Sequence, residues 1–203
     1  MTLNDIRAIG VIGAGQMGSG IAQVCATAGY QVVLHDVSPK QIEKGAAAIK
    51  KSLDRFIAKK IITEQQASDA QRNLRTTSSV GDLQVCDFAI EAATERVDLK
   101  LAIFKELDKT LRPNAVLSSN TSSIPITKLA AATSRPDRVV GMHFMNPPAL
   151  MKLVEIVPGL DTSEETQILT TTLAEKLGKI PVKCVEQPGF IVNRILLPMI
   201  NEA

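Results

Sequence analysis

The sequence predicts an α/β protein built on a doubly wound, mainly parallel β-sheet. Short apolar runs rich in Val, Ile and Leu alternate with longer segments whose apolar residues recur at helical spacing. This alternation is typical of βαβ units, whose parallel strands are buried on both faces. Hydrophobic residues make up 45% of the 203 residues and aromatic residues only 3%, so we expect a core of small aliphatic side chains.

The first elements are marked by helix-capping signals. Two strands with a helix between them are expected over residues 6–12, 16–28 and 31–35. Ser38 and Pro39 are typical of an N-cap and a first helical position, and they open a long charged helix that runs to about residue 60. The Thr-Glu-Gln-Gln sequence from Thr63 matches a capping box and predicts a shorter helix after it.

The remaining elements complete one domain and begin another. Further strands are expected over residues 74–77, 87–91, 115–119, 139–144, 153–157 and 180–184, with helices over 98–111 and 164–177. The rhythm breaks at a Gln-Pro-Gly sequence, and an apolar helical stretch follows. We therefore expect a nucleotide-binding domain over 1–187, with 188–203 as the first helix of a truncated all-helical C-terminal domain. Its unpartnered apolar side chains should be exposed: Phe190, Ile191, Ile195, Leu196, Leu197 and Ile200.

Composition and charge argue against several function classes. The net charge is only +2, and the low aromatic content disfavours stacking on single-stranded nucleic acid. No apolar run approaches the roughly 20 residues of a membrane helix, and no signal peptide precedes the first strand. Cys25, Cys86 and Cys184 form no Cys-x-x-Cys pair and are expected to be buried thiols. We expect a cytoplasmic protein without nucleic-acid, membrane or metal partners.

A glycine-rich turn after the first strand predicts a dinucleotide site. Residues 13–18 match G-x-G-x-x-G between a strand and a helix, the context of a Rossmann-type fold. The six expected cofactor contacts are Gly13, Ala14, Gly15, Gln16, Met17 and Gly18. Asp36 ends the second strand, where it should accept hydrogen bonds from ribose hydroxyls and repel a 2′-phosphate; this favours NAD over NADP. The alternative is that the glycines serve only a tight turn and Asp36 only a helix start.

Three polar segments are expected beyond the carboxyl ends of later strands, over residues 118–123, 143–148 and 152–157. Glu155 is expected on the same strand face as the apolar Leu153 and Val157, and a carboxylate in such surroundings needs a polar partner. His143, on a neighbouring strand, is the simplest candidate for that partner. The pair would make a general base, in which Glu155 orients the imidazole and His143 takes a proton from a substrate hydroxyl. His35, the other histidine, is interpreted as a bystander near the adenine side.

The serine-rich loop has two interpretations. Ser123 could be an N-cap for a following helix, but capping does not explain a run of Ser, Thr and Asn at a strand end. Ser122 could hydrogen-bond a substrate oxygen.

These residues resemble the 3-hydroxyacyl-CoA dehydrogenase family, and within it the bacterial branch that acts on 3-hydroxybutyryl-CoA. The resemblance covers essentially the whole chain. It lies in the blocks GAGQMGSGIAQ from Gly13, SNTSS from Ser119, HFMNPP from His143, MKLVEIV from Met151 and PGFIVNR from Pro188.

The resemblance implies NAD-linked oxidation of the 3-hydroxyl of a (3S)-hydroxyacyl-CoA to a ketone, or the reverse, in fatty-acid or butanoate metabolism. Within it, His143, Glu155, Ser122 and Asn193 would be the catalytic residues. Asp36, Glu95, Lys100, Ser122 and Asn146 would contact the cofactor, and Ser52, Lys59 and Ser122 the coenzyme A substrate. The family also implies a homodimer formed through the C-terminal helical domain.

The helix after Asp36 carries a local charge that suits a phosphate-bearing substrate. Residues 38–60 hold seven Lys and Arg against two acids, an excess of +5, although a solvated helix face would give the same pattern. Two alternatives stay open from the sequence: an NAD-binding fragment without turnover, and a dehydrogenase of free hydroxy acids.

Overall fold

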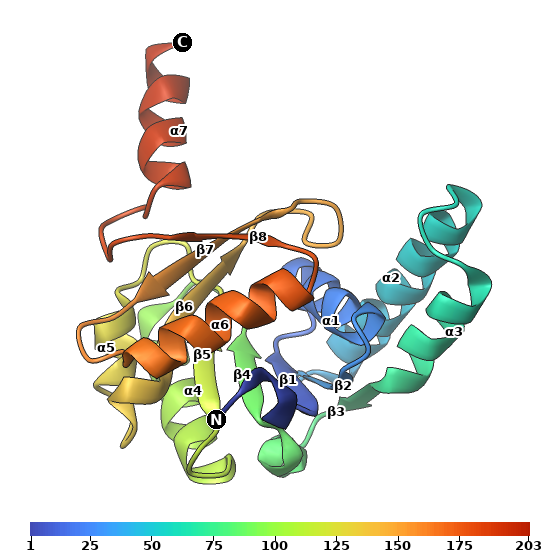
Figure 1. Ribbon diagram of the computed structural model, residues 1–203, viewed down its shortest axis with the longest axis horizontal. Helices are drawn as coiled ribbons and strands as arrows, with labels where there is room; N and C mark the ends of the chain where they lie inside the picture. Colours follow the sequence, from blue (N-terminus) through green and yellow to red (C-terminus); the bar gives the residue numbers. More distant parts are fainter.

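The computed structural model describes residues 1–203 and contains one eight-stranded sheet with the order β3-β2-β1-β4-β5-β6-β7-β8 (Figure 1). Neighbouring strands are parallel except β6 and β7, which pair antiparallel. The strands are β1 (Ala8–Ile12), β2 (Gln31–His35), β3 (Leu74–Thr77), β4 (Phe88–Glu91), β5 (Val116–Ser119), β6 (Val139–Phe144), β7 (Leu153–Pro158) and β8 (Ile180–Lys183). The predicted doubly wound, mainly parallel sheet is confirmed.

Seven α-helices accompany the strands. They are α1 (Gln16–Thr27), α2 (Pro39–Ala58), α3 (Glu64–Asn73), α4 (Val97–Thr110), α5 (Ile126–Ala130), α6 (Glu164–Lys176) and α7 (Val192–Glu202). Every predicted strand and long helix is present. The strand ends differ from the predicted ends by no more than two residues, and so do most of the helix ends. The short α5 and three 3-10 turns were not predicted, because three to six residues cannot show a helical period.

The helix starts follow the capping signals. Ser38 Oγ accepts from the backbone N–H of Gln41 at 3.3 Å, and Pro39 occupies the first turn of α2. Thr63 and Gln66 form the reciprocal capping box at the start of α3, with distances of 3.1 and 2.8 Å. These local bonds satisfy N–H groups that have no partner inside the helix.

Alternating side chains of the strands feed two separate cores. On β1, Ile9 and Val11 belong to the core covered by α1, α2, α3 and α6, while Ala8 and Ile12 belong to the core covered by α4 and α5. Both cores consist mainly of aliphatic side chains. The period of two along a strand therefore divides the apolar residues between both faces of the sheet, as expected for parallel strands.

The order of the strands places a ligand crevice at the centre. The chain proceeds from β1 outward through β2 and β3, and then returns to β4 on the other side of β1. In such sheets ligands bind beyond the carboxyl ends of the strands where the direction reverses. Helix α7 projects away from the sheet (Figure 1). No helix combines the length and apolar character needed to cross a membrane.

Candidate functional site

The glycine-rich turn forms an open cradle at the start of α1. Gly13 has a φ of +101°, and a Cβ there would lie 2.7 Å from the Ala92 carbonyl oxygen. A Cβ on Gly18 would overlap the Gly13 carbonyl oxygen, so both positions need glycine for packing. A Cβ on Gly15, by contrast, would meet no atom within 4 Å. Gly15 caps α1 without a side chain and leaves room for a pyrophosphate at the helix N-terminus.

Asp36 lies beside this cradle and is fixed by backbone donors. Its Oδ2 accepts from Ala14 N at 2.8 Å and its Oδ1 from Ser38 N at 2.9 Å. A cavity of about 530 Å³ opens next to it, of a size suited to a nucleoside. The lining includes Asp36 and Glu106 but no Lys or Arg, so the residues present fit NAD and offer no partner to a 2′-phosphate.

His35 also lines this cavity. Burial lowers the pKa of His35, against the opposing influence of the Asp36 and Glu106 carboxylates. Its Nδ1 is buried without a hydrogen-bond partner. His35 therefore shares the cavity with Asp36, and its position on the adenine side stays a prediction.

The other histidine forms the expected pair. His143 and Glu155 are directly opposite in the β6–β7 register, and His143 Nδ1 lies 2.6 Å from Glu155 Oε2. Both side chains are buried. Glu155 Oε1 accepts from the backbone N–H groups of Ile191 and Val192, each at 2.9 Å. The carboxylate thus joins the imidazole to the start of α7.

The direction of β7 corrects one expectation. The sequence pattern placed residues 152–157 beyond the carboxyl end of a strand, whereas β7 runs antiparallel to β6 and reaches this edge with its amino end. The loop over residues 145–152 reverses the chain, and periodicity along a strand carries no information about direction. Glu155 still faces His143, because side-chain alternation is the same in both directions.

Phe190 is a further residue of this site that the sequence pattern misplaced. It was expected to be exposed, yet it is 3% exposed and packs edge-on against the His143 ring with centroids 5.7 Å apart. Its φ of +50° turns the chain at this point, and α7 begins only at Val192. The other apolar residues predicted to be exposed are exposed: Ile191, Ile195, Leu196, Leu197 and Ile200. The apolar pattern alone does not show that Phe190 precedes the helix and is not part of it.

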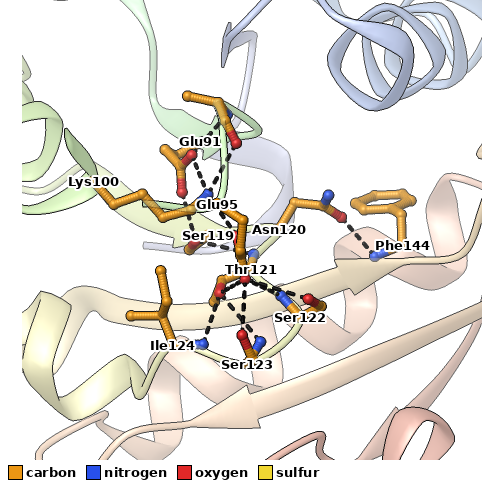
Figure 2. Close-up of polar contacts among 11 residues, drawn as sticks. Glu91, Glu95, Lys100, Ser119, Asn120, Thr121, Ser122, Ser123, Ile124 and Phe144 are labelled. Carbon is orange, nitrogen blue, oxygen red and sulfur yellow. Dashed lines mark hydrogen bonds and ion pairs between the residues drawn. The ribbon is translucent and has the colours of Figure 1, made fainter. Parts of the chain in front are cut away.

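The serine-rich loop is held by a carboxylate from another element (Figure 2). Glu95 Oε1 accepts from Thr121 Oγ1 at 2.5 Å, and from Ser122 N at 2.9 Å. It also lies 3.3 Å from the hydroxyls of Ser122 and Ser123. Ser123 does not cap a helix: α5 has Pro125 as its N-cap without a side-chain bond. The alternative capping interpretation of Ser123 is therefore wrong.

The same loop is tied to the strand of His143. Asn120 Oδ1 accepts from the backbone N–H of Phe144 at 2.8 Å (Figure 2). Asn146, in the loop after that strand, accepts from Gln16 Nε2 at 3.1 Å and so reaches the cradle. Buried Lys179 holds this loop through the carbonyls of Pro148 and Met151, at 2.6 and 2.9 Å. Lys179 was not predicted as part of the site, because its partners are backbone atoms distant in the sequence.

The structure brings some predicted residues together and leaves others apart. The cradle, Asp36, the Glu95–Ser122 contact and the His143–Glu155 pair share one edge of the sheet. Asn193 lies half-buried on α7. Ser52 lies on α2 and Lys59 is the C-cap residue of that helix, and a separate cavity of about 380 Å³ adjoins the helix at Phe56.

The three cysteines are free and buried, as predicted. Burial raises the pKa of each thiol to about 12, which makes them poor nucleophiles and poor metal ligands.

Comparison with known proteins identifies a matching family and several relatives of this chain. Residues 8–187 match the family model described as "3-hydroxyacyl-CoA dehydrogenase, NAD binding domain". The chain is 49% identical over 198 residues to a 3-hydroxybutyryl-CoA dehydrogenase of Bradyrhizobium diazoefficiens, covering 98% of this chain and 68% of that protein. It is 44% identical to one of Mycobacterium tuberculosis, covering 70% of that protein. The crystal structure of (S)-3-hydroxybutyryl-CoA dehydrogenase from Ralstonia eutropha superposes with a TM-score of 0.95 at 49% identity, covering 98% of this chain and 70% of that one.

Proposed function

Because this chain belongs to the 3-hydroxyacyl-CoA dehydrogenase family, we propose that it interconverts (3S)-3-hydroxybutyryl-CoA and the corresponding 3-ketoacyl-CoA with NAD. The observation that carries the proposal is the buried His143–Glu155 pair at 2.6 Å, on the same sheet edge as the Gly13–Gly18 cradle. A role in fatty-acid metabolism is supported by one relative, which is named as the alpha subunit of a fatty acid oxidation complex.

His143 acts as the general base in the direction of oxidation. With Nδ1 bonded to Glu155, Nε2 is the nitrogen left to take the proton of the substrate hydroxyl. Glu155 fixes the tautomer and stabilises the imidazolium that forms. Ser122, held by Glu95, presents its hydroxyl to the substrate oxygen. NAD⁺, when bound, supplies the acceptor for the hydride that leaves the carbinol carbon.

The phosphate-rich coenzyme A portion of the substrate is assigned to α2. Ser52 and Phe56 are four residues apart and share one face of α2, and Lys59 follows as the C-cap residue of the helix. Phe56 lines the cavity of about 380 Å³, whose lining also includes Lys152, Lys176 and Lys179 and no acidic side chain. A lining that combines apolar and cationic side chains suits a ligand that combines an adenine ring with phosphates.

Helix α7 is assigned to a further helical domain, which would complete the substrate site and support a homodimer. Its residues from Ile195 to Ile200 include five apolar side chains that are 45–61% exposed. Exposed apolar side chains clustered in this way indicate an interface. Asn193, at the start of α7, would then lie between the two domains beside His143.

The proposal is tested by following NADH oxidation on addition of acetoacetyl-CoA to the full-length protein. We expect turnover in the wild type and its loss in His143→Asn, with NADH affinity retained. Turnover of free acetoacetate but not of its CoA thioester would favour a dehydrogenase of free hydroxy acids. NADH binding without turnover of either substrate would indicate a binding module, and unchanged turnover in His143→Asn would show that the base is misassigned.

A further inference from the structure

Glu91 is a buried carboxylate at the carboxyl end of β4 to which the mechanism above gives no role. It is 0% exposed, and both its oxygens are occupied (Figure 2). Oε1 accepts from Lys100 Nζ at 2.5 Å and from Ala93 N at 2.7 Å, and Oε2 accepts from Ser119 Oγ at 2.6 Å. A buried carboxylate is retained only where charged or polar partners compensate its lost hydration.

Lys100 is saturated by the protein itself. Its side chain is 1% exposed, and Nζ lies 2.5 Å from Glu91, 3.2 Å from the Ala93 carbonyl and 3.3 Å from Glu95 Oε2. An ammonium has three N–H donors, so no donor is left for a ligand. Lys100 therefore reaches a bound cofactor through Glu95, which is partly exposed at the sheet edge.

The two carboxylates hold the 119–123 loop at its two ends. Glu91 fixes Ser119, whose Oγ also accepts from Thr121 N at 3.1 Å. Glu95 fixes the loop from Thr121 onward, including the backbone N–H and hydroxyl of Ser122. Burial alone would raise the pKa of Glu95, but the hydrogen bonds from Thr121 and Ser122 and the Lys100 charge outweigh it and lower that pKa, so the carboxylate stays ionised at neutral pH.

We propose that Glu91 is a positioning residue: through Lys100 and Ser119 it sets the places of Glu95 and Ser122 under the nicotinamide half of the dinucleotide. This inference rests on the proposed function. The adenosine and pyrophosphate portions are assigned to the cradle and the cavity beside Asp36, which is lined from the ends of β1 and β2, the residues after β4 and one face of α4. The other half of the cofactor then extends over β4 and β5, where Glu95 and Ser122 lie.

Glu91→Gln is the direct test, because the amide fits the existing contacts while the charge is lost. Its oxygen can face the two donors Lys100 and Ala93, and its amide nitrogen can face the Ser119 hydroxyl, which can accept. The ammonium of Lys100 then has Glu95 as its only carboxylate partner and draws it away from the loop. We expect the Kd for NADH to rise about tenfold, the equivalent of one hydrogen bond to a charged group.

ADP is the control ligand, because it contains only the half of the cofactor that the cradle holds. Its affinity, measured by calorimetry, should change less than about twofold in Glu91→Gln, whereas general damage to the fold would weaken both ligands equally. Asp108→Asn serves as the matched variant, since it breaks another largely buried ion pair, with Arg135 at 2.7 Å, at the far end of α4. It should alter the affinity for neither ligand.

A double variant keeps the test decisive if Glu91→Gln does not fold. Glu91→Gln with Lys100→Met leaves no unpaired buried charge and removes the ammonium that holds Glu95 Oε2 in place, so NADH should again bind about tenfold more weakly with ADP unchanged. NADH affinity equal to the wild type in either folded variant would overturn the positioning role alone. A wild type that binds NADH no more tightly than ADP, or that binds neither ligand, would overturn the proposed function together with the positioning role.

Discussion

Replacing Glu155 by Gln should abolish the base while leaving the fold intact. Glu155 faces four donors and no acceptor: His143 Nδ1 at 2.6 Å, the backbone N–H groups of Ile191 and Val192 at 2.9 Å each, and the Cys184 thiol at 3.7 Å. A glutamine offers one accepting oxygen and one donating amide nitrogen. The donors on one side of the former carboxylate must therefore lose their acceptor.

The cheaper orientation of the glutamine decides the outcome. Turning the amide nitrogen toward α7 would oppose two fixed backbone donors, each bond to the carboxylate being worth about 1.5–3 kcal/mol. Turning it toward His143 requires only that Nδ1 become the acceptor. The ring proton then moves to Nε2, which can no longer take a proton from the substrate. We expect kcat to fall about 10²–10⁴-fold, or roughly 3–5 kcal/mol in activation free energy.

The assay is NADH absorbance with acetoacetyl-CoA as substrate in the full-length protein, with NADH affinity measured by fluorescence. Affinity should be unchanged, because Glu155 lies away from the cradle. Glu186→Gln is the matched control: that carboxylate also accepts a backbone N–H, from Thr127 at 2.6 Å, but lies apart from the His143 pair. A folded Glu155→Gln variant that keeps kcat within about threefold of the wild type, or a ¹⁵N spectrum that shows the same His143 tautomer in both proteins, would refute the reasoning.

Three further outcomes are expected. Gly15→Ala should leave the unfolding temperature unchanged yet weaken NADH binding at least tenfold, because its Cβ enters only the open cradle; Gly18→Ala should instead lower the unfolding temperature, because its Cβ overlaps the Gly13 carbonyl oxygen. Since the folded-state pKa of Glu95 is lowered, its stabilising effect is complete above the ordinary value of 4.5 and is lost as pH falls through the lowered value. The difference in unfolding temperature between wild type and Glu95→Gln should accordingly be constant from pH 6 to 8 and shrink in acid. The three buried thiols, with pKa raised to about 12, should react with a disulfide reagent at pH 8 only after denaturation.

The elements that the sequence predicted share a local cause. Strand and helix positions follow from side-chain period, and the starts of α2 and α3 follow from caps that lie within four residues of their partners. The cradle was likewise predictable, because a tight turn, a close helix and a phosphate site impose glycine at fixed short spacing. The His143–Glu155 pair was inferred from a carboxylate on an apolar strand face, which needs a partner wherever the fold provides one.

What only the tertiary structure decided depends on residues distant in sequence. The reversal of β7, the packing of Phe190 on His143 and the role of Lys179 all involve contacts that no local period encodes. The Glu91–Lys100–Glu95 cluster is the clearest case: a charged residue of α4 looks like a solvated one until packing places it against β4 and leaves it 1% exposed. Local bonding rules determined the elements of this protein, whereas burial, which the whole sheet sets, determined which charges meet.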